Sequence, residues 1–226
     1  MPITMENITG IVFILARMSG CIFLNPIFGR RNVPAIVKAS IVMVLTLLFY
    51  SYSPLKIAPI GTVLEYTVLL LKEFAVGYTI GFIMYIFSSI IILGGEMIDF
   101  QIGISMAKVF DAQSNMSVAL SATFYNIIYM FLFFAGNAHL TLIKIMLNSS
   151  KIVPYGNVLF GQDIAIYIVN LFCESTVLAM KFAMPIIGIG FMIEIGVGIL
   201  MKIIPQINIF VVNIQLKLLV GFCAMM

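Results

Sequence analysis

Long apolar segments interrupted by single charges constrain this chain more than any other feature. Hydrophobic residues make up 62% of its 226 residues and charged residues only 9%. This composition is typical of helices surrounded by lipid or by other apolar helices. A charge at membrane depth costs about 2.5–3.5 kcal/mol on insertion scales, so each one needs a partner within the chain or in another subunit. The charges inside the apolar segments are Arg17, Glu73, Glu96, Asp99, Glu174, Lys181, Glu194 and Lys202.

Segments of helical length fill most of the chain and predict an all-α, integral membrane-associated protein. We expect a single helical domain over residues 1–226, because no polar, proline-rich or serine-rich linker divides it. Positive charges are spread evenly over alternate loops, so they predict no orientation in a membrane. About six apolar segments are expected at 8–28, 35–50, 62–107, 118–135, 164–184 and 185–201, with shorter runs at 140–147 and 207–226.

Glu73, Gly77 and Gly81 lie four residues apart and share one face of a predicted helix. The two glycines form a G-x-x-x-G pattern, which allows close helix approach in apolar surroundings. The simplest interpretation is a packing groove. The alternative is that Glu73 faces a polar conduit or a cation of a partner.

Glu96, Asp99 and Gly103 share a second helix face, with Gln101 nearby. The two carboxylates could make structural contacts or pair with Lys or Arg of a neighbouring subunit, which we favour, or could relay protons or bind a cation. No nucleophile with an orienting base accompanies them, so no enzymatic activity is expected. His139 is the only histidine, which argues against a multi-histidine metal site. We expect no cofactor, and the net charge of +3 is too small to predict nucleic-acid binding.

Two further stretches suggest packing or a path through the protein. Residues 108–117 are polar in the middle of an apolar chain and predict a loop that lines a cavity or reaches water, because its backbone groups need partners. The segment 185–201 is rich in glycine, which favours tight helix packing, with a hinge as the alternative. These glycines are Gly188, Gly190, Gly196 and Gly198.

An ordered set of residues along the chain carries a family resemblance. Its most specific stretches are 95–107 (GEMIDFQIGISMA), followed by Asp111, and 198–206 (GILMKIIPQ). Over nearly its whole length the chain resembles the flagellar biosynthetic protein FliR family and its type III secretion counterparts. Ala112 stands where the family often has proline, and the family usually continues past Met226, so we expect a short member or a truncated chain. The other matching positions are Arg17, Pro26, Arg31, Pro34, Lys38, Glu73, Gly77, Gly81, His139, Leu140, Pro154, Pro185, Phe210 and Gly221.

The resemblance implies a non-enzymatic subunit of a flagellar protein export gate in the bacterial inner membrane, at the flagellar basal body. Such subunits assemble with FliP-like and FliQ-like subunits around a central pore, and their helical hairpins sit largely above the bilayer plane. The further partners would be FlhB-like and FlhA-like export proteins, membrane lipid and the transported unfolded flagellar proteins.

The resemblance also implies roles for particular residues. In the family, the loop that corresponds to 108–117 lies inside the pore and helps close it. The pore plug would here comprise Phe110, Asp111, Ala112, Gln113, Ser114, Asn115 and Met116. The polar assembly face would comprise Arg17, Glu73, Gly77, Gly81, Glu96, Asp99, Gln101, Gly103, Lys202, Pro205 and Gln206.

Two alternatives stay open at this point. The injectisome counterpart of the export gate shares the fold and the motifs. A small proton-coupled secondary transporter could use Glu73, Glu96 and Asp99 as coupling groups. It would need an internal repeat, which the sequence does not display.

Overall fold

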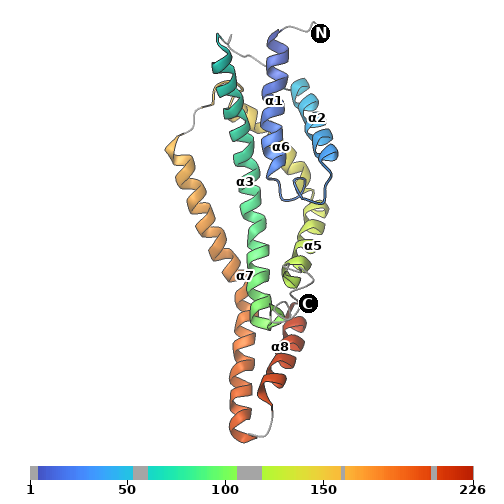
Figure 1. The fold of residues 1–226 in the computed structure, drawn as a ribbon, viewed down its shortest axis with the longest axis vertical. Helices are drawn as coiled ribbons and strands as arrows, with labels where there is room; N and C mark the ends of the chain where they lie inside the picture. Colours follow the sequence, from blue (N-terminus) through green and yellow to red (C-terminus); the bar gives the residue numbers. More distant parts are fainter. Residues whose placement is uncertain (1–4, 53–60, 106–118, 159–160, 205–207, 226) are drawn as a thin grey trace. The chain divides into compact units, whose positions relative to one another are not determined.

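The computed structural model describes residues 5–52, 61–105, 119–158, 161–204 and 208–225. Within these ranges the regular elements are α-helices, which confirms the predicted all-α fold (Figure 1). Three of them, α2, α3 and α7, are long and apolar enough to cross a membrane, and the bent pair α5 and α6 would make a fourth span. The helices are α1 (Met5–Phe23), α2 (Ala35–Tyr52), α3 (Val63–Ile102), α5 (Leu120–Ala135), α6 (Ala138–Ile152), α7 (Gln162–Ile203) and α8 (Ile209–Met225).

The first helix ends at Phe23, earlier than the predicted residue 28. The cause is a side-chain turn at Asn25, whose Oδ1 accepts hydrogen bonds from the backbone N–H groups of Ile27 at 2.9 Å and Phe28 at 3.0 Å. Pro26 follows Asn25 and disfavours helical backbone at that residue. These local bonds compete with the helix and stop it.

The long helix α3 is continuous, as predicted, but it ends at Ile102 rather than near residue 107. Gly103 adopts a left-handed conformation with φ of 91°, and its N–H donates to the Asp99 carbonyl at 3.1 Å. A left-handed glycine is a common helix terminator, because it lacks the Cβ that makes this conformation costly. Gly103, predicted as part of an assembly face, therefore ends this helix.

The predicted break at Pro185 is wrong, because α7 runs through it as one helix from Gln162 to Ile203. A proline inside a helix removes one backbone hydrogen bond. Here Ala183 and Ile186 are both buried on either side of it. Their packing against Ile98 and Ile102 holds the helix together across the proline.

The predicted short apolar stretch at 140–147 belongs to a longer helix, α6. A sharp corner separates it from α5, and the two helix axes differ by 69°. Asn137 makes this corner in the left-handed conformation, with φ of 55°. Asparagine tolerates this conformation better than most residues.

The chain packs as two compact units, each of which has its own core. The first comprises Met1–Ser88 and Leu132–Asn170, and within it α1 packs along α2 (Figure 1). The second comprises Ser89–Phe131 and Leu171–Met226. The single domain expected from the sequence stays a prediction. The core of the first unit includes Phe13, Ile14, Met18, Phe49 and Met146, and that of the second includes Ile98, Ile102, Ala183 and Ile186.

Candidate functional site

A buried ion pair joins α1 to α3 in the first unit. Arg17 Nε donates to Glu73 Oε2 at 2.7 Å, and Arg17 Nη2 lies 2.7 Å from the same oxygen. Both side chains are 0% exposed. Buried charges are tolerated only when they are paired and hydrogen-bonded. Two charges that stand alone in the sequence thus neutralise each other within the chain.

The same ion pair holds the segment that follows α6. Arg17 Nη1 donates to the Val153 carbonyl at 2.9 Å, and the Gly156 N–H donates to Glu73 Oε1 at 2.8 Å. The Arg17 guanidinium also lies 4.2 Å from the centre of the Tyr155 ring, a cation–π contact. Burial raises the pKa of the Tyr155 phenol, although Arg17 opposes this shift. The result is a polar network that ties two helices and a loop together.

Helices α1 and α3 approach so closely beside this network that only glycine fits. A Cβ added to Gly77 would lie 1.8 Å from the Arg17 carbonyl oxygen, and one on Gly20 would lie 2.3 Å from the Phe74 carbonyl oxygen. At Gly81 the nearest atom would be the Cys21 carbonyl oxygen, at 2.7 Å. The glycine face packs here inside the unit, next to the ion pair.

Asp99 makes an internal contact in the second unit. Its side chain is 0% exposed, and Oδ1 accepts hydrogen bonds from the backbone N–H of Ser121, at 3.0 Å, and from the Ser121 hydroxyl. Ser121 lies in the first turn of α5, where backbone N–H groups lack partners within the helix. The carboxylate therefore fixes the start of α5 against α3, and it complements the positive end of the helix dipole.

Glu96 lies one turn before Asp99 and has a different environment. It is exposed and lines a cavity of about 450 Å³ in the second unit, next to Phe100, whose side chain is 77% exposed. Among the described residues the acid–base pairs are Arg17 with Glu73 and Lys217 with Glu194, so no described cation neutralises Glu96. An unpaired carboxylate in apolar surroundings can accept a cation from a partner. The other lining residues are Leu93, Met97, Gln101, Met180 and Ile187.

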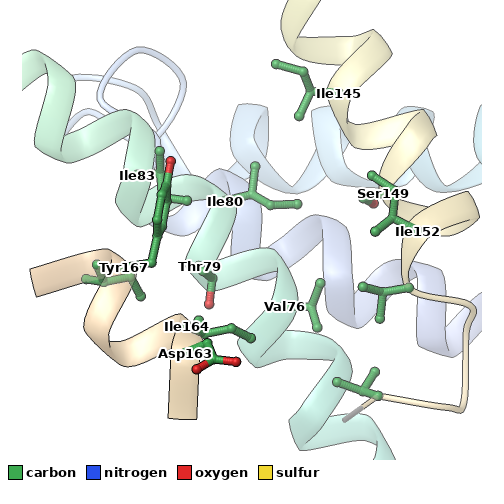
Figure 2. A pocket seen from close by; sticks show the side chains of 13 residues that line it. Val76, Thr79, Ile80, Ile83, Ile145, Ser149, Ile152, Asp163, Ile164 and Tyr167 are labelled. Atoms are coloured by element: carbon green, nitrogen blue, oxygen red, sulfur yellow. The ribbon is translucent and has the colours of Figure 1, made fainter. Parts of the chain in front are cut away.

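A second cavity lies in the first unit and has a volume of about 510 Å³ (Figure 2). Branched aliphatic side chains of α3, α6 and the first turns of α7 form most of its wall. Asp163 is the one charged residue among those that line it. Neither cavity offers a metal site, since no group of three His, Cys, Asp or Glu side chains lies together in the part of the chain that the structure describes.

Comparison with known proteins identifies the family of this chain. Residues 8–226 match the family described as bacterial export proteins, family 1. The chain belongs to this family. It is 29% identical over 214 residues to the flagellar biosynthetic protein FliR of Bacillus subtilis (strain 168). The aligned region covers 93% of this chain and 82% of the relative.

Two other relatives support the same grouping of this export protein. The flagellar biosynthetic protein FliR of Pectobacterium carotovorum subsp. carotovorum is 28% identical over 205 residues, or 91% of this chain and 78% of the relative. That of Escherichia coli (strain K12) is 25% identical over 211 residues, or 93% of this chain and 80% of the relative.

The residues predicted as one polar assembly face divide between the two units of the export protein. Arg17, Glu73, Gly77 and Gly81 come together inside the first unit. Glu96, Asp99, Gln101, Gly103 and Lys202 belong to the second. Lys202 is exposed near the end of α7. The predicted plug residues 110–116, together with Pro205 and Gln206, lie outside the described residues.

The glycines of α7 differ from the expectation of tight packing. A Cβ on Gly188, Gly196 or Gly198 would meet nothing within 4 Å, so these positions mediate no close contact within the chain. Only Gly190 is crowded, since a Cβ there would lie 2.6 Å from Gln101 Nε2.

Sequence reasoning missed several residues of these sites. Tyr155 and Gly156 complete the polar network, but nothing in the sequence links a loop residue to a charge 83 positions earlier. Ser121 carried a usable signal, because serine near a helix start often contacts a carboxylate or a free N–H group. Gly20 carried another, since it lies one helical turn from Arg17.

Proposed function

We propose that this chain is a subunit of the bacterial flagellar type III protein export apparatus and helps form and close its pore. The observation that carries the proposal is the family match over residues 8–226, together with FliR relatives that align over most of their length. The subunit acts by assembly and by gating rather than by catalysis. Its partners are FliP-like and FliQ-like gate subunits, FlhB-like and FlhA-like export proteins and unfolded flagellar proteins, in the inner membrane at the basal body.

The surface of the helices supports a role in assembly. Large apolar side chains are exposed in both units, among them Ile36 on α2, Met192 on α7 and Phe210 on α8. Such apolar surface faces lipid or other subunits. Glu96 adds a specific feature, because an unpaired carboxylate beside Phe100 suits a partner lysine or arginine.

A role in an injectisome is the alternative within the same superfamily. Complementation separates the two, because the flagellar assignment requires the chain to act with flagellar partners. We expect the gene, expressed with its own gate partners, to restore motility to a strain that lacks its flagellar gate. Restoration of injectisome secretion without motility would establish the alternative.

Assembly provides the direct test of the proposed function. Coexpressed with its FliP-like and FliQ-like partners, the chain is expected to copurify in detergent as one large hetero-oligomer. Expressed alone it is expected to be unstable, because exposed apolar surface and Glu96 then lack partners. The mass of the extracted particle measures this. A stable, monodisperse monomer that ignores the partners would contradict the proposal.

Replacement of Glu96 by glutamine separates assembly from proton chemistry. If Glu96 pairs with a partner cation, Glu96→Gln lowers the yield of the complex, since loss of one member of a desolvated charge pair costs about 2–5 kcal/mol. If it relays protons instead, the complex forms normally but export loses its dependence on the proton gradient. Glu65→Gln, which removes an exposed carboxylate in the first turn of the same helix and outside the cavity, is the matched control. Normal yield and normal export in Glu96→Gln would refute both roles.

Deletion of residues 111–115 tests the proposed plug. We expect the complex to assemble but to leak small ions or dyes, because the role proposed for these residues is to help close the pore. Conductance or dye uptake in cells that carry the deletion measures the leak. If the mutant complex leaked no more ions or dye than the parent complex, residues 111–115 would not be needed to close the pore.

A further inference from the structure

One buried acidic residue contacts both ends of the segment that joins α3 to α5. The Asp99 carbonyl accepts the N–H of Gly103, the left-handed residue that ends α3, at 3.1 Å. Asp99 Oδ1 accepts the N–H of Ser121, in the first turn of α5, at 3.0 Å, and also the Ser121 hydroxyl. We call the contact between these two side chains the Asp99–Ser121 clamp. Residues 104–120 lie between the two contacts and include the proposed plug, residues 110–116.

The two ends of this segment are packed as well as hydrogen-bonded. On the α3 side, Ile104 packs against the core cluster that contains Ile98 and Ile102. On the α5 side, a Cβ on Gly95 would lie 2.4 Å from the Ala122 Cα, so the two backbones are in close contact. This contact lies one helical turn before Asp99 on α3. It does not depend on the Asp99 side chain, so α3 and α5 stay packed together when that side chain is replaced.

The hydrogen bonds of the Asp99 side chain are directed at the start of α5. The side chain is 0% exposed, and Oδ2 has no hydrogen-bond partner in the part of the chain that the structure describes. The described hydrogen bonds of the carboxylate therefore all go to Ser121. Hydrogen bonds to a carboxylate are roughly twice as strong as those between neutral groups. Replacing Asp99 thus releases the start of α5 and removes no other described side-chain hydrogen bond.

The position of the acceptor in the sequence separates this contact from an ordinary helix cap. A helix start is usually capped by the residue that directly precedes it, which fixes the first turn locally. Here the acceptor lies 22 residues earlier, on a different helix. A local cap would leave the two ends of the segment free to separate, whereas the Asp99–Ser121 clamp sets the place of the α5 start on α3.

We propose that Asp99 is a positioning residue for pore closure, because the Asp99–Ser121 clamp keeps the two ends of residues 104–120 together and so holds the proposed plug in place. This inference rests on the proposed function, since it gives Asp99 a part in closing the same pore. Asp99 acts inside the subunit rather than at an interface, in agreement with its complete burial. The polar assembly face predicted from the sequence therefore loses this member.

Hydrogen exchange measures the clamp directly in the purified complex. In Asp99→Ala, the N–H groups in the first turn of α5 are expected to exchange roughly ten- to hundredfold faster, the effect of losing a hydrogen bond to a charged group. Ser121→Ala removes the hydroxyl donor alone and should show a smaller increase. Ser175→Ala is the matched control, because Ser175 is also buried but donates to the Phe172 carbonyl of its own helix at 2.7 Å. Unchanged exchange in both Asp99→Ala and Ser121→Ala would refute the clamp.

Leakage of the assembled complex tests the role in closure. We expect Asp99→Ala and Ser121→Ala to give a parent-like yield of complex that leaks more ions or dye than the parent. Asp99→Asn, which keeps a neutral acceptor, should leak less than Asp99→Ala, and Ser175→Ala should not leak. A lowered yield without a leak would mean that Asp99 is merely structural and would overturn the proposal.

Deletion of residues 111–115 separates failure of this inference from failure of the proposed plug. If the deletion leaks but Asp99→Ala and Ser121→Ala do not, although the start of α5 exchanges faster, the positioning role is wrong and the plug stands. If the deletion does not leak either, the plug fails and the positioning role fails with it. The exchange experiment then still reports whether the clamp itself exists.

Discussion

Replacing Glu73 by alanine is expected to destabilise the chain by about 3–5 kcal/mol, because it leaves Arg17 buried without its counter-charge. It also removes the acceptor of the Gly156 N–H. For a chain of this size the loss corresponds to a fall in melting temperature of roughly 6–20 °C. Thermal melting in detergent and abundance of the chain in membranes measure it. Arg17→Ala is expected to have an effect of similar size.

Two control variants test whether the expected loss of stability in Glu73→Ala comes from the broken ion pair. Glu174→Ala removes an exposed carboxylate for which no ion pair is found among the described residues, and it should change the melting temperature little. The double change Arg17→Met with Glu73→Leu should recover part of the loss, because a buried ion pair can often be replaced by apolar side chains. A melting temperature of Glu73→Ala within a degree or two of the parent would contradict the role of the network.

Gly77→Ala is expected to be the most damaging single-methyl change in the first unit. The new Cβ would lie 1.8 Å from the Arg17 carbonyl oxygen. No side-chain rotation relieves this clash, because the Cβ position is fixed by the α3 backbone and the oxygen belongs to the α1 backbone. Helices α1 and α3 must then separate, which strains the Arg17–Glu73 pair one turn away. We expect a cost above the usual 1–3 kcal/mol of overpacking. Abundance of the chain in membranes and the yield of its complex measure the effect.

The matched control is Gly188→Ala, where a Cβ would meet nothing within 4 Å in the chain. In the middle of α7 it should stabilise the helix by up to about 1 kcal/mol, because alanine has the higher helix propensity. Gly81→Leu, at the next glycine of the same α3 face, should lower abundance as well, since its Cβ would lie 2.7 Å from the Cys21 carbonyl oxygen. Parent-like abundance of Gly77→Ala would show that the two helices can separate at no cost.

Helix ends and breaks show why local patterns mislead. Asn25-Pro26 and Gly103 both carry recognisable stop signals, and the structure uses both. Pro185 carries the same kind of signal, yet α7 continues through it. At Asn25 a side-chain turn competes with the helix, and at Gly103 a left-handed residue ends it. At Pro185 the residues on each side, Ala183 and Ile186, pack into one core cluster, which keeps the helix in register. Only contacts distant in sequence could reveal that.

For the charged residues too, the sequence predicted the need for a partner, and the tertiary structure identified the partner. Their presence within apolar segments predicted that they need partners, since an unpaired charge costs too much there. The partners themselves came from the tertiary structure: Glu73 for Arg17, and Ser121 for Asp99. Glu96 shares a helix face with Asp99 by spacing alone, but only the structure separates a buried capping residue from an exposed carboxylate in a cavity.

The sequence by itself determined the all-helical class, the positions of most helices and the membership in an export family, because hydrophobic periodicity and ordered motifs are local properties of the chain. The tertiary structure decided which charges are satisfied inside the chain, where glycine is indispensable and which cavities stay open. These depend on distances between segments as far apart as residues 17 and 153. Spacing along one helix cannot supply such distances, because it says nothing about the element on the other side of the contact.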